Sequence, residues 1–239
     1  MLPRRILCLY GDGTNAMVFA AQTRHLRRAL EPYGIELVYA TGPFECEPGY
    51  GVPPFFDDCG PFYCWCPNDP RDGYGQETTA EDDAAESTAM ATGIVDMFQD
   101  LRYEFDGFVG ILGFSSAAAI VAGILAVQDN GDDELCPAWY CFRFGILVNG
   151  TGPPARLLII GGGGGSKPRP IEVPTLSVVG KQDQWRGQSK LLNTYFDKDL
   201  VTCLEFDNGH KIPSEDGQVK EMASAILDMV RKTEECIQV

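Results

Sequence analysis

Histidines and basic side chains are scarce in this chain of 239 residues, which has two histidines and 19 lysines and arginines against 34 acidic residues. The net charge of −15 argues against nucleic acid or an anionic membrane surface as a partner, because both repel an acidic protein. No apolar run approaches the roughly 20 residues that a membrane span requires. The first apolar run, Ile6 to Tyr10, is too short for the core of a signal peptide. We therefore expect a cytoplasmic protein.

Cysteines with the spacing of a metal site are also missing. The nine cysteines are scattered, and the closest pair, Cys64 and Cys66, forms a C-W-C sequence. A zinc site requires C-x-x-C pairs, or cysteines combined with suitably spaced histidines. The sequence thus predicts no metal site, and free thiols that are mostly buried.

A glycine-rich run, Leu157 to Gly165, invites comparison with nucleotide-binding loops. It lacks the spacing G-x-G-x-x-G, and prolines at 168 and 170 follow it in place of a helix. The pattern favours a flexible loop, within a Gly/Pro-rich stretch at residues 150–170, over a cofactor site.

Compact apolar runs alternate along the chain with segments of helical period, which predicts an α/β fold. We expect a doubly wound, mostly parallel sheet with helices on both faces, formed by a single domain over residues 1–239. The predicted strands are Ile6–Tyr10, Ile35–Tyr39, Phe108–Leu112, Cys141–Val148, Val173–Gly180 and Val201–Phe206. The predicted helices are Ala16–Leu30, Thr79–Leu101, Ala117–Val127, Ser189–Phe196 and Gln218–Arg231.

The stretch Glu45 to Gln76 shows neither a helical nor an alternating period, and Pro, Gly, Asp and aromatic residues dominate it. A long segment of this kind is usually functional or disordered, and its aromatic residues argue against disorder. We predict an irregular, ordered loop over the site. The alternative is a surface insertion packed on the core.

The sequence Gly113-Phe114-Ser115-Ser116-Ala117 joins a predicted strand to a predicted helix. It matches the nucleophile-elbow pattern G-x-S-x-G, with Ala in the last place. Small residues two before and two after the serine allow the sharp turn that exposes its hydroxyl. Ser115 is therefore the candidate nucleophile.

A base and an acid are expected just past other strands. His210 follows the last predicted strand, whereas His25 lies among arginines in a predicted helix, so His210 is the candidate base. Asp183 follows another predicted strand, and the order Ser115, Asp183, His210 is the order that α/β-hydrolases use. Asp207 is the alternative acid, although its position before His210 suits a turn.

An acyl-transfer site also needs two N–H donors for the oxyanion. The backbone N–H of Ser116, at the start of the helix, is one candidate. The other is the N–H of Asp12 in the loop Gly11 to Thr14, where Gly11 permits close approach. The alternative interpretation of that loop is a phosphate-binding turn.

Together these residues resemble the fungal serine hydrolase (FSH) family, which includes thioesterases that release polyketides. The resemblance spans nearly the whole chain and rests on Leu7 to Gly11, Asn15, Phe19, Gln22, the elbow, the Gly180-x-x-Asp183 turn and Gly209-His210. It implies an α/β-hydrolase fold with no large separate lid domain, no metal and no cofactor. It also implies the catalytic residues Ser115, Asp183 and His210.

The chain departs from the family pattern in the loop after the first predicted strand and in the elbow. Tyr10 stands where the family usually has His, and Ser116-Ala117 stands where it has Gln-Gly. Asp12 brings a carboxylate beside the proposed oxyanion hole, so its side chain must point away.

The expected activity is hydrolysis of an ester or thioester of a mostly apolar acyl group in fungal polyketide metabolism, through an acyl-enzyme on Ser115. The substrate is a small molecule or is presented by an acyl carrier protein. Carbon–carbon bond hydrolysis, acyl transfer and non-catalytic binding remain alternatives. The loop at 45–76 contains only one basic residue, Arg71, which suggests little affinity for a phosphate or a carboxylate. The candidate substrate-binding residues are Tyr10, Gly11, Phe44, Tyr63, Trp65 and Trp185.

Overall fold

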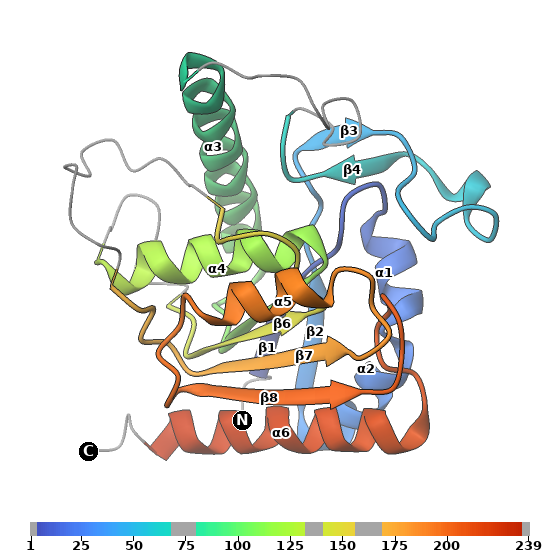
Figure 1. The fold of residues 1–239 in the computed structure, drawn as a ribbon, viewed down its shortest axis with the longest axis vertical. Helices are drawn as coiled ribbons and strands as arrows, with labels where there is room; N and C mark the ends of the chain where they lie inside the picture. Colours follow the sequence, from blue (N-terminus) through green and yellow to red (C-terminus); the bar gives the residue numbers. More distant parts are fainter. Residues whose placement is uncertain (1–3, 68–79, 132–140, 156–168, 236–239) are drawn as a thin grey trace.

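A six-stranded parallel sheet forms the centre of the computed structural model, which describes residues 4–67, 80–131, 141–155 and 169–235 (Figure 1). Strands with helices on both faces are buried on both sides and therefore consist of near-continuous apolar runs. Every residue of the two strands β6 and β7 is accordingly buried. In spatial order the strands are β2 (Ile35–Tyr39), β1 (Arg4–Leu9), β5 (Gly110–Phe114), β6 (Phe144–Val148), β7 (Thr175–Gly180) and β8 (Val201–Phe206).

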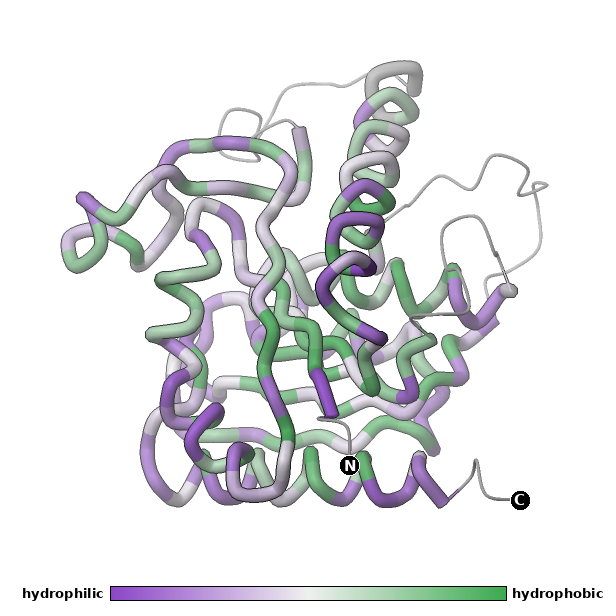
Figure 2. The backbone as a smooth tube through the Cα atoms, turned by 180° about the vertical axis from the view of Figure 1, so that it is seen from behind, coloured by the Kyte–Doolittle hydropathy of each residue, from purple (hydrophilic) through white to green (hydrophobic). Residues whose placement is uncertain are grey.

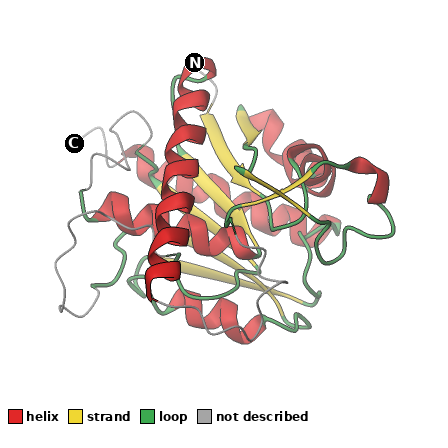
Figure 3. Ribbon diagram, turned by 90° about the horizontal axis from the view of Figure 1, so that it is seen from above, coloured by secondary structure: helices red, strands yellow, loops and turns green. Residues whose placement is uncertain are grey.

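Helices cover both faces of this sheet, which confirms the predicted fold class. On one face α6 packs against α2, and α4 and α5 lie over the other (Figure 1). Figure 2 shows hydrophobic residues concentrated in the central strands and alternating with hydrophilic ones along α6. Figure 3 shows the long α3 lying over the twisted fan of strands. The helices are α1 (Ala16–Gln22), α2 (Arg24–Leu30), α3 (Ala80–Glu104), α4 (Ser116–Asp129), α5 (Arg186–Asn193) and α6 (Asp216–Glu235).

The strand order reverses at β1. The chain passes from β1 outward to β2 and later returns to place β5 on the other side of β1, where Leu9 pairs with Gly113. Ligands of open α/β sheets bind at such a switch point, outside the carboxyl ends of the strands. The loops after β1 and β5 are therefore the natural walls of a site.

The helix predicted over Ala16–Leu30 is two helices that meet at Thr23. The Thr23 side chain is buried, its hydroxyl donates to the carbonyl of Phe19 at 2.8 Å, and it lies 2.6 Å from the hydroxyl of Tyr39. These bonds hold the chain in a bend. Asn15 caps α1, as predicted, because its side chain accepts from the N–H of Val18 at 2.9 Å.

The prediction that residues 45–76 are irregular is wrong in part. Strands β3 (Phe44–Cys46) and β4 (Phe62–Cys64) form an antiparallel pair, and a short 3₁₀ helix, η2 (Asp57–Cys59), lies between them. Tyr63 ties this pair to the loop after β1, because its carbonyl accepts from Gly13 N–H at 3.0 Å and its N–H donates to Thr14 O at 2.8 Å. Residues 68–79, and the glycine-rich run at 157–165, lie outside the described residues.

The described cysteines are free thiols, but most are not buried. Only Cys8 and Cys64 of the seven are fully buried, and Cys141 and Cys203 are exposed. Desolvation raises the pKa of the Cys66 thiol to about 12, which makes it a poor nucleophile. No helix in the described part of the chain is both long and apolar enough to cross a membrane.

Gly113 offers a test of the close packing beneath the turn after β5. A Cβ atom there would lie 2.5 Å from the carbonyl oxygen of Ala117, whereas a Cβ at Gly187 in α5 would meet nothing within 4 Å. Gly113→Ala should therefore lower the free energy of unfolding by about 1–3 kcal/mol, and Gly187→Ala should not lower it. Urea denaturation of both variants measures the difference, and equal stabilities would contradict the packing described here.

Candidate active site

Ser115 lies at the apex of a sharp turn between β5 and α4. Its backbone has φ 58° and ψ −127°, a conformation that residues other than glycine rarely adopt and that is typical of functional sites. The Ser115 N–H donates to the carbonyl of Val148 at 3.0 Å, which fixes the turn to the neighbouring strand. Gly11 approaches so closely that a Cβ there would lie 2.9 Å from the Ser115 Cβ. The local backbone thus presents one serine hydroxyl at the switch point.

Asp183 and His210 reach this serine from the loops after β7 and β8. His210 Nε2 lies 2.9 Å from Ser115 Oγ, and His210 Nδ1 lies 2.8 Å from Asp183 Oδ2. The second carboxylate oxygen of Asp183 accepts from the N–H of Trp185 at 2.8 Å. The Asp183 side chain is fully buried and that of His210 is 9 % exposed. The structure therefore places the three predicted residues in one hydrogen-bonded chain.

Two aromatic rings hold the imidazole in place. The Trp185 ring lies 4.5 Å from the His210 ring, centroid to centroid, in an edge-to-face arrangement, and the Phe114 ring lies 5.1 Å away. Tyr50 stacks edge-to-face on the outer side of Trp185 at 5.4 Å and is itself exposed. Trp185 was predicted to line the site, whereas Tyr50 was missed because nothing in the sequence separates it from its aromatic neighbours.

Asn149 is a second residue that the sequence did not reveal. Its buried side chain donates to the carbonyls of Gly209 and Lys211, at 3.4 and 3.0 Å, and accepts from the N–H of Gly180 at 2.7 Å. It thereby links the turn that carries Asp183 to the turn that carries His210. The feature of the sequence that could have pointed to Asn149 is its position directly after a predicted strand.

The rival residues lie elsewhere. His25 is on α2 and is not among the residues that line the cavity beside Ser115. Asp207 is exposed and accepts from the side chain of Gln182 at 2.8 Å, while His210 Nδ1 faces Asp183.

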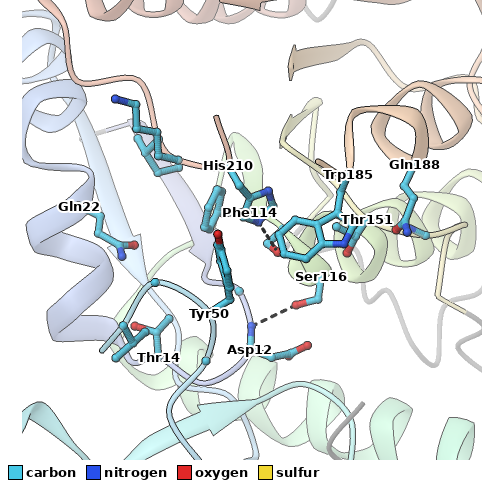
Figure 4. Close-up of a pocket in the computed structure, with 18 of the residues that line it drawn as sticks. Asp12, Thr14, Gln22, Tyr50, Phe114, Ser116, Thr151, Trp185, Gln188 and His210 are labelled. Atoms are coloured by element: carbon cyan, nitrogen blue, oxygen red, sulfur yellow. Dashed lines mark hydrogen bonds between the residues drawn. The ribbon is translucent and has the colours of Figure 1, made fainter. Parts of the chain in front are cut away.

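The proposed oxyanion donors also lie beside the serine. The N–H of Asp12 donates to the Ser116 hydroxyl oxygen at 3.1 Å (Figure 4). One carboxylate oxygen of Asp12 accepts from the N–H of Trp65 at 3.4 Å. This bond holds that oxygen toward the Trp65 backbone.

Tyr10 and Trp65 belong to the core and do not contact the cavity. Both are fully buried, the Trp65 indole N–H donates to the carbonyl of Tyr10 at 2.6 Å, and the Tyr10 hydroxyl accepts from Gly42 N–H at 2.7 Å. Phe44 and Tyr63 on the β3–β4 pair are likewise absent from the cavity wall. The four predicted substrate-binding residues are thus not part of the cavity wall, and Tyr63 and Trp65 instead form hydrogen bonds to the chain from Tyr10 to Thr14.

A cavity of about 580 Å³ opens above Ser115. Figure 4 shows Thr14 and Gln22 on one side of Tyr50 and His210, and Thr151 and Gln188 on the opposite side, and we call these two parts of the lining the arms of the cavity. The remaining lining residues are Gly11, Asp12, Arg24, Gly49, Gly51, Val52, Phe114, Ser116, Gly152, Trp185, Lys211, Ile212 and Ser214. Among the described residues, no group of three His, Cys, Asp or Glu side chains could hold a metal ion.

A model of one protein family, described as serine hydrolase (FSH1), matches residues 1–222 of the chain. The chain belongs to this serine hydrolase family. The resemblance inferred from the sequence motifs is thereby confirmed.

Named relatives in this family are fungal. Esterase dbaE of Emericella nidulans is 30 % identical over 260 residues, covering 96 % of this chain and 91 % of that protein. Thioesterase FSL2 of Gibberella zeae is 27 % identical over 235 residues, covering 93 % and 90 %. Among solved structures, esterase PE8 aligns with a TM-score of 0.58 at 16 % identity, covering 95 % of this chain and 93 % of that one, which supports the fold alone.

The two tryptophans near the site should respond differently to truncation. Trp65→Ala should lower the free energy of unfolding by about 3–5 kcal/mol, because it empties a fully buried site. Trp185→Ala removes an edge-to-face contact of about 0.5–1.5 kcal/mol that orients His210, so kcat for ester hydrolysis should fall about two- to tenfold. Chemical denaturation and steady-state kinetics on both variants check this, and a Trp185→Ala variant with unchanged kcat would contradict it.

Proposed function

We propose that the protein hydrolyses an ester or thioester through an acyl-enzyme formed on Ser115. The observation that carries this proposal is the continuous chain from Ser115 Oγ through the His210 imidazole to the buried Asp183 carboxylate, at 2.9 and 2.8 Å. A serine hydroxyl is a weak nucleophile unless an adjacent base takes its proton. Both bonds have lengths suited to that transfer.

In the proposed first half-reaction, Ser115 Oγ attacks the substrate carbonyl while His210 Nε2 accepts its proton. Asp183 keeps the Nδ1 proton in place and stabilises the imidazolium. His210 then returns the proton to the leaving alcohol or thiol, which leaves the acyl group on Ser115. In the second half, water attacks this ester with His210 again as the base, and the acid product departs.

The oxyanion of each tetrahedral intermediate would accept from the backbone N–H groups of Asp12 and Ser116. In the free protein the Asp12 N–H is already bonded to the Ser116 hydroxyl oxygen. We propose that this hydroxyl serves as a stand-in acceptor and rotates away when the substrate oxygen arrives. This partly buried N–H then has a partner both before and after substrate binds.

We propose a largely apolar acyl group as the substrate's main recognition element, because Phe114, Trp185, Tyr50, Val52 and Ile212 contribute to the cavity wall. The relatives' names, esterase and thioesterase, support either an oxygen or a sulfur leaving group. By the family resemblance, we place the reaction in fungal polyketide metabolism in the cytoplasm. The substrate would be a free small molecule or an acyl chain on a carrier protein.

Covalent labelling tests the nucleophile. A fluorophosphonate should modify the protein once, Ser115→Ala should abolish the modification, and the matched variant Ser116→Ala should keep it because its backbone N–H remains. Intact-protein mass spectrometry reads the result. Labelling that persists in Ser115→Ala, or that disappears equally in both variants, would overturn the assignment of Ser115.

A further inference from the structure

Two buried side-chain oxygen atoms beside the cavity have no hydrogen-bond partner among the described residues. They are Thr14 Oγ1 and Gln22 Oε1, and both residues line the cavity above Ser115. Buried polar atoms in native proteins are almost always paired, and an unpaired one needs an explanation. Thr14 itself is only 4 % exposed. Both residues belong to one cavity wall, so a polar ligand group that packs against this wall would give the two oxygens a partner.

The bend at Thr23 positions this part of the wall. Gln22 is the last residue of α1 and Arg24 is the first of α2, and the buried Thr23 between them is fixed to Phe19 and Tyr39. Figure 4 shows Thr14 and Gln22 in the same arm of the cavity, away from Thr151 and Gln188. We call Thr14, Gln22 and Arg24 the polar arm.

The charge of the cavity wall is opposite to that of the whole chain. Arg24 and Lys211 line it, and neither forms an ion pair with any described residue. The Arg24 Nη1 donates to the carbonyl of Ala21 at 3.0 Å, which leaves further guanidinium N–H groups for a ligand. Asp12 is the one acidic lining residue, and its carboxylate faces Trp65. In a protein of net charge −15, this is a local cationic site.

We propose that the polar arm binds the far end of the substrate, and that this end carries a carboxylate with a neighbouring hydroxyl. The guanidinium of Arg24 suits a carboxylate, Gln22 Oε1 would accept from the hydroxyl, and Thr14 Oγ1 can donate to either group. The inference rests on the proposed function at Ser115 and deepens it. It also replaces the sequence-based expectation that the site offers little to a carboxylate, because that expectation considered only residues 45–76.

Matched ester pairs test the polar arm. The probes are 4-nitrophenyl monoesters of adipate, pimelate and suberate, whose carboxylates are too far from the ester to cleave it themselves, each compared with the 4-nitrophenyl alkanoate of equal carbon number. For at least one chain length, kcat/KM of wild type should be about five times higher for the carboxylate ester than for the matched alkanoate. This ratio is the one expected for a partly exposed charged contact. Arg24→Gln should bring this ratio to one or below, and Arg28→Gln, an exposed arginine of the same helix outside the cavity, should leave it unchanged.

Thr14→Val separates recognition from folding. Because it removes an unpaired buried oxygen, it should leave the protein at least as stable in urea and still lower the ratio. A wild-type preference for the alkanoate at every length, or equal ratios in Arg24→Gln and Arg28→Gln, would overturn the polar arm.

Failure of the proposed function is distinguishable from failure of the polar arm. Turnover of 4-nitrophenyl acetate by wild type reports on Ser115 alone, so turnover without a carboxylate preference rejects only the polar arm. If no ester is turned over, calorimetry of the adipate monoester with Ser115→Ala still tests binding. Binding heat that is measured with Ser115→Ala and is lost in the double variant Ser115→Ala/Arg24→Gln supports the polar arm. Absence of binding heat in both of these variants rejects it.

Discussion

The left-handed backbone at Ser115 is the constraint on which the rest of the site depends. At φ 58° the turn brings the start of α4 against the end of β5, so only small residues fit around it. Gly113 has no room for a side chain, Ala117 is fully buried, and Gly11 must pass close to the serine. The strain of one residue thus fixes the identity of several neighbours. As a result, the Ser115 hydroxyl lies beyond the end of β5, where the His210 imidazole can reach it.

The three site residues come from loops that are far apart in sequence, so their alignment needs a separate support. Asn149 supplies it, because one buried amide bonds to both the Gly180 turn and the chain around His210. Trp185 acts on the same pair, with its N–H on the Asp183 carboxylate and its ring against the imidazole. The loop after β1 is held in the same way by the β3–β4 pair and by Trp65. The site is therefore positioned from three sides by residues other than Ser115, Asp183 and His210.

Much of this could be predicted from local sequence pattern. The apolar runs that become β2 and β8 have the predicted bounds, and the position of Ser115, Asp183 and His210 just past strands follows from the same runs. A parallel sheet then brings those positions to one edge, whichever residues fill the core.

Features that depend on distant partners could not be predicted. The break at Thr23 rests on a contact with Tyr39, and β3 and β4 are three residues each, too short to show an alternating period. The local sequence does not distinguish the roles of Trp65 and Trp185, but Trp65 packs behind the loop after β1 and Trp185 packs over His210. The polar arm was missed because Thr14 and Gln22 lie in a loop and at a helix end that only the folded chain brings together.

The most direct measurement of the central claim is the location of the acyl group during turnover. A chromogenic ester is mixed rapidly with the protein, quenched in acid within milliseconds to seconds, and the digest is mapped by mass spectrometry. The account predicts a transient acyl group on the peptide that contains Ser115, with a burst of alcohol or thiol before steady state. An acyl group on another residue, or steady turnover with no adduct and no burst even for the most activated ester, would contradict it.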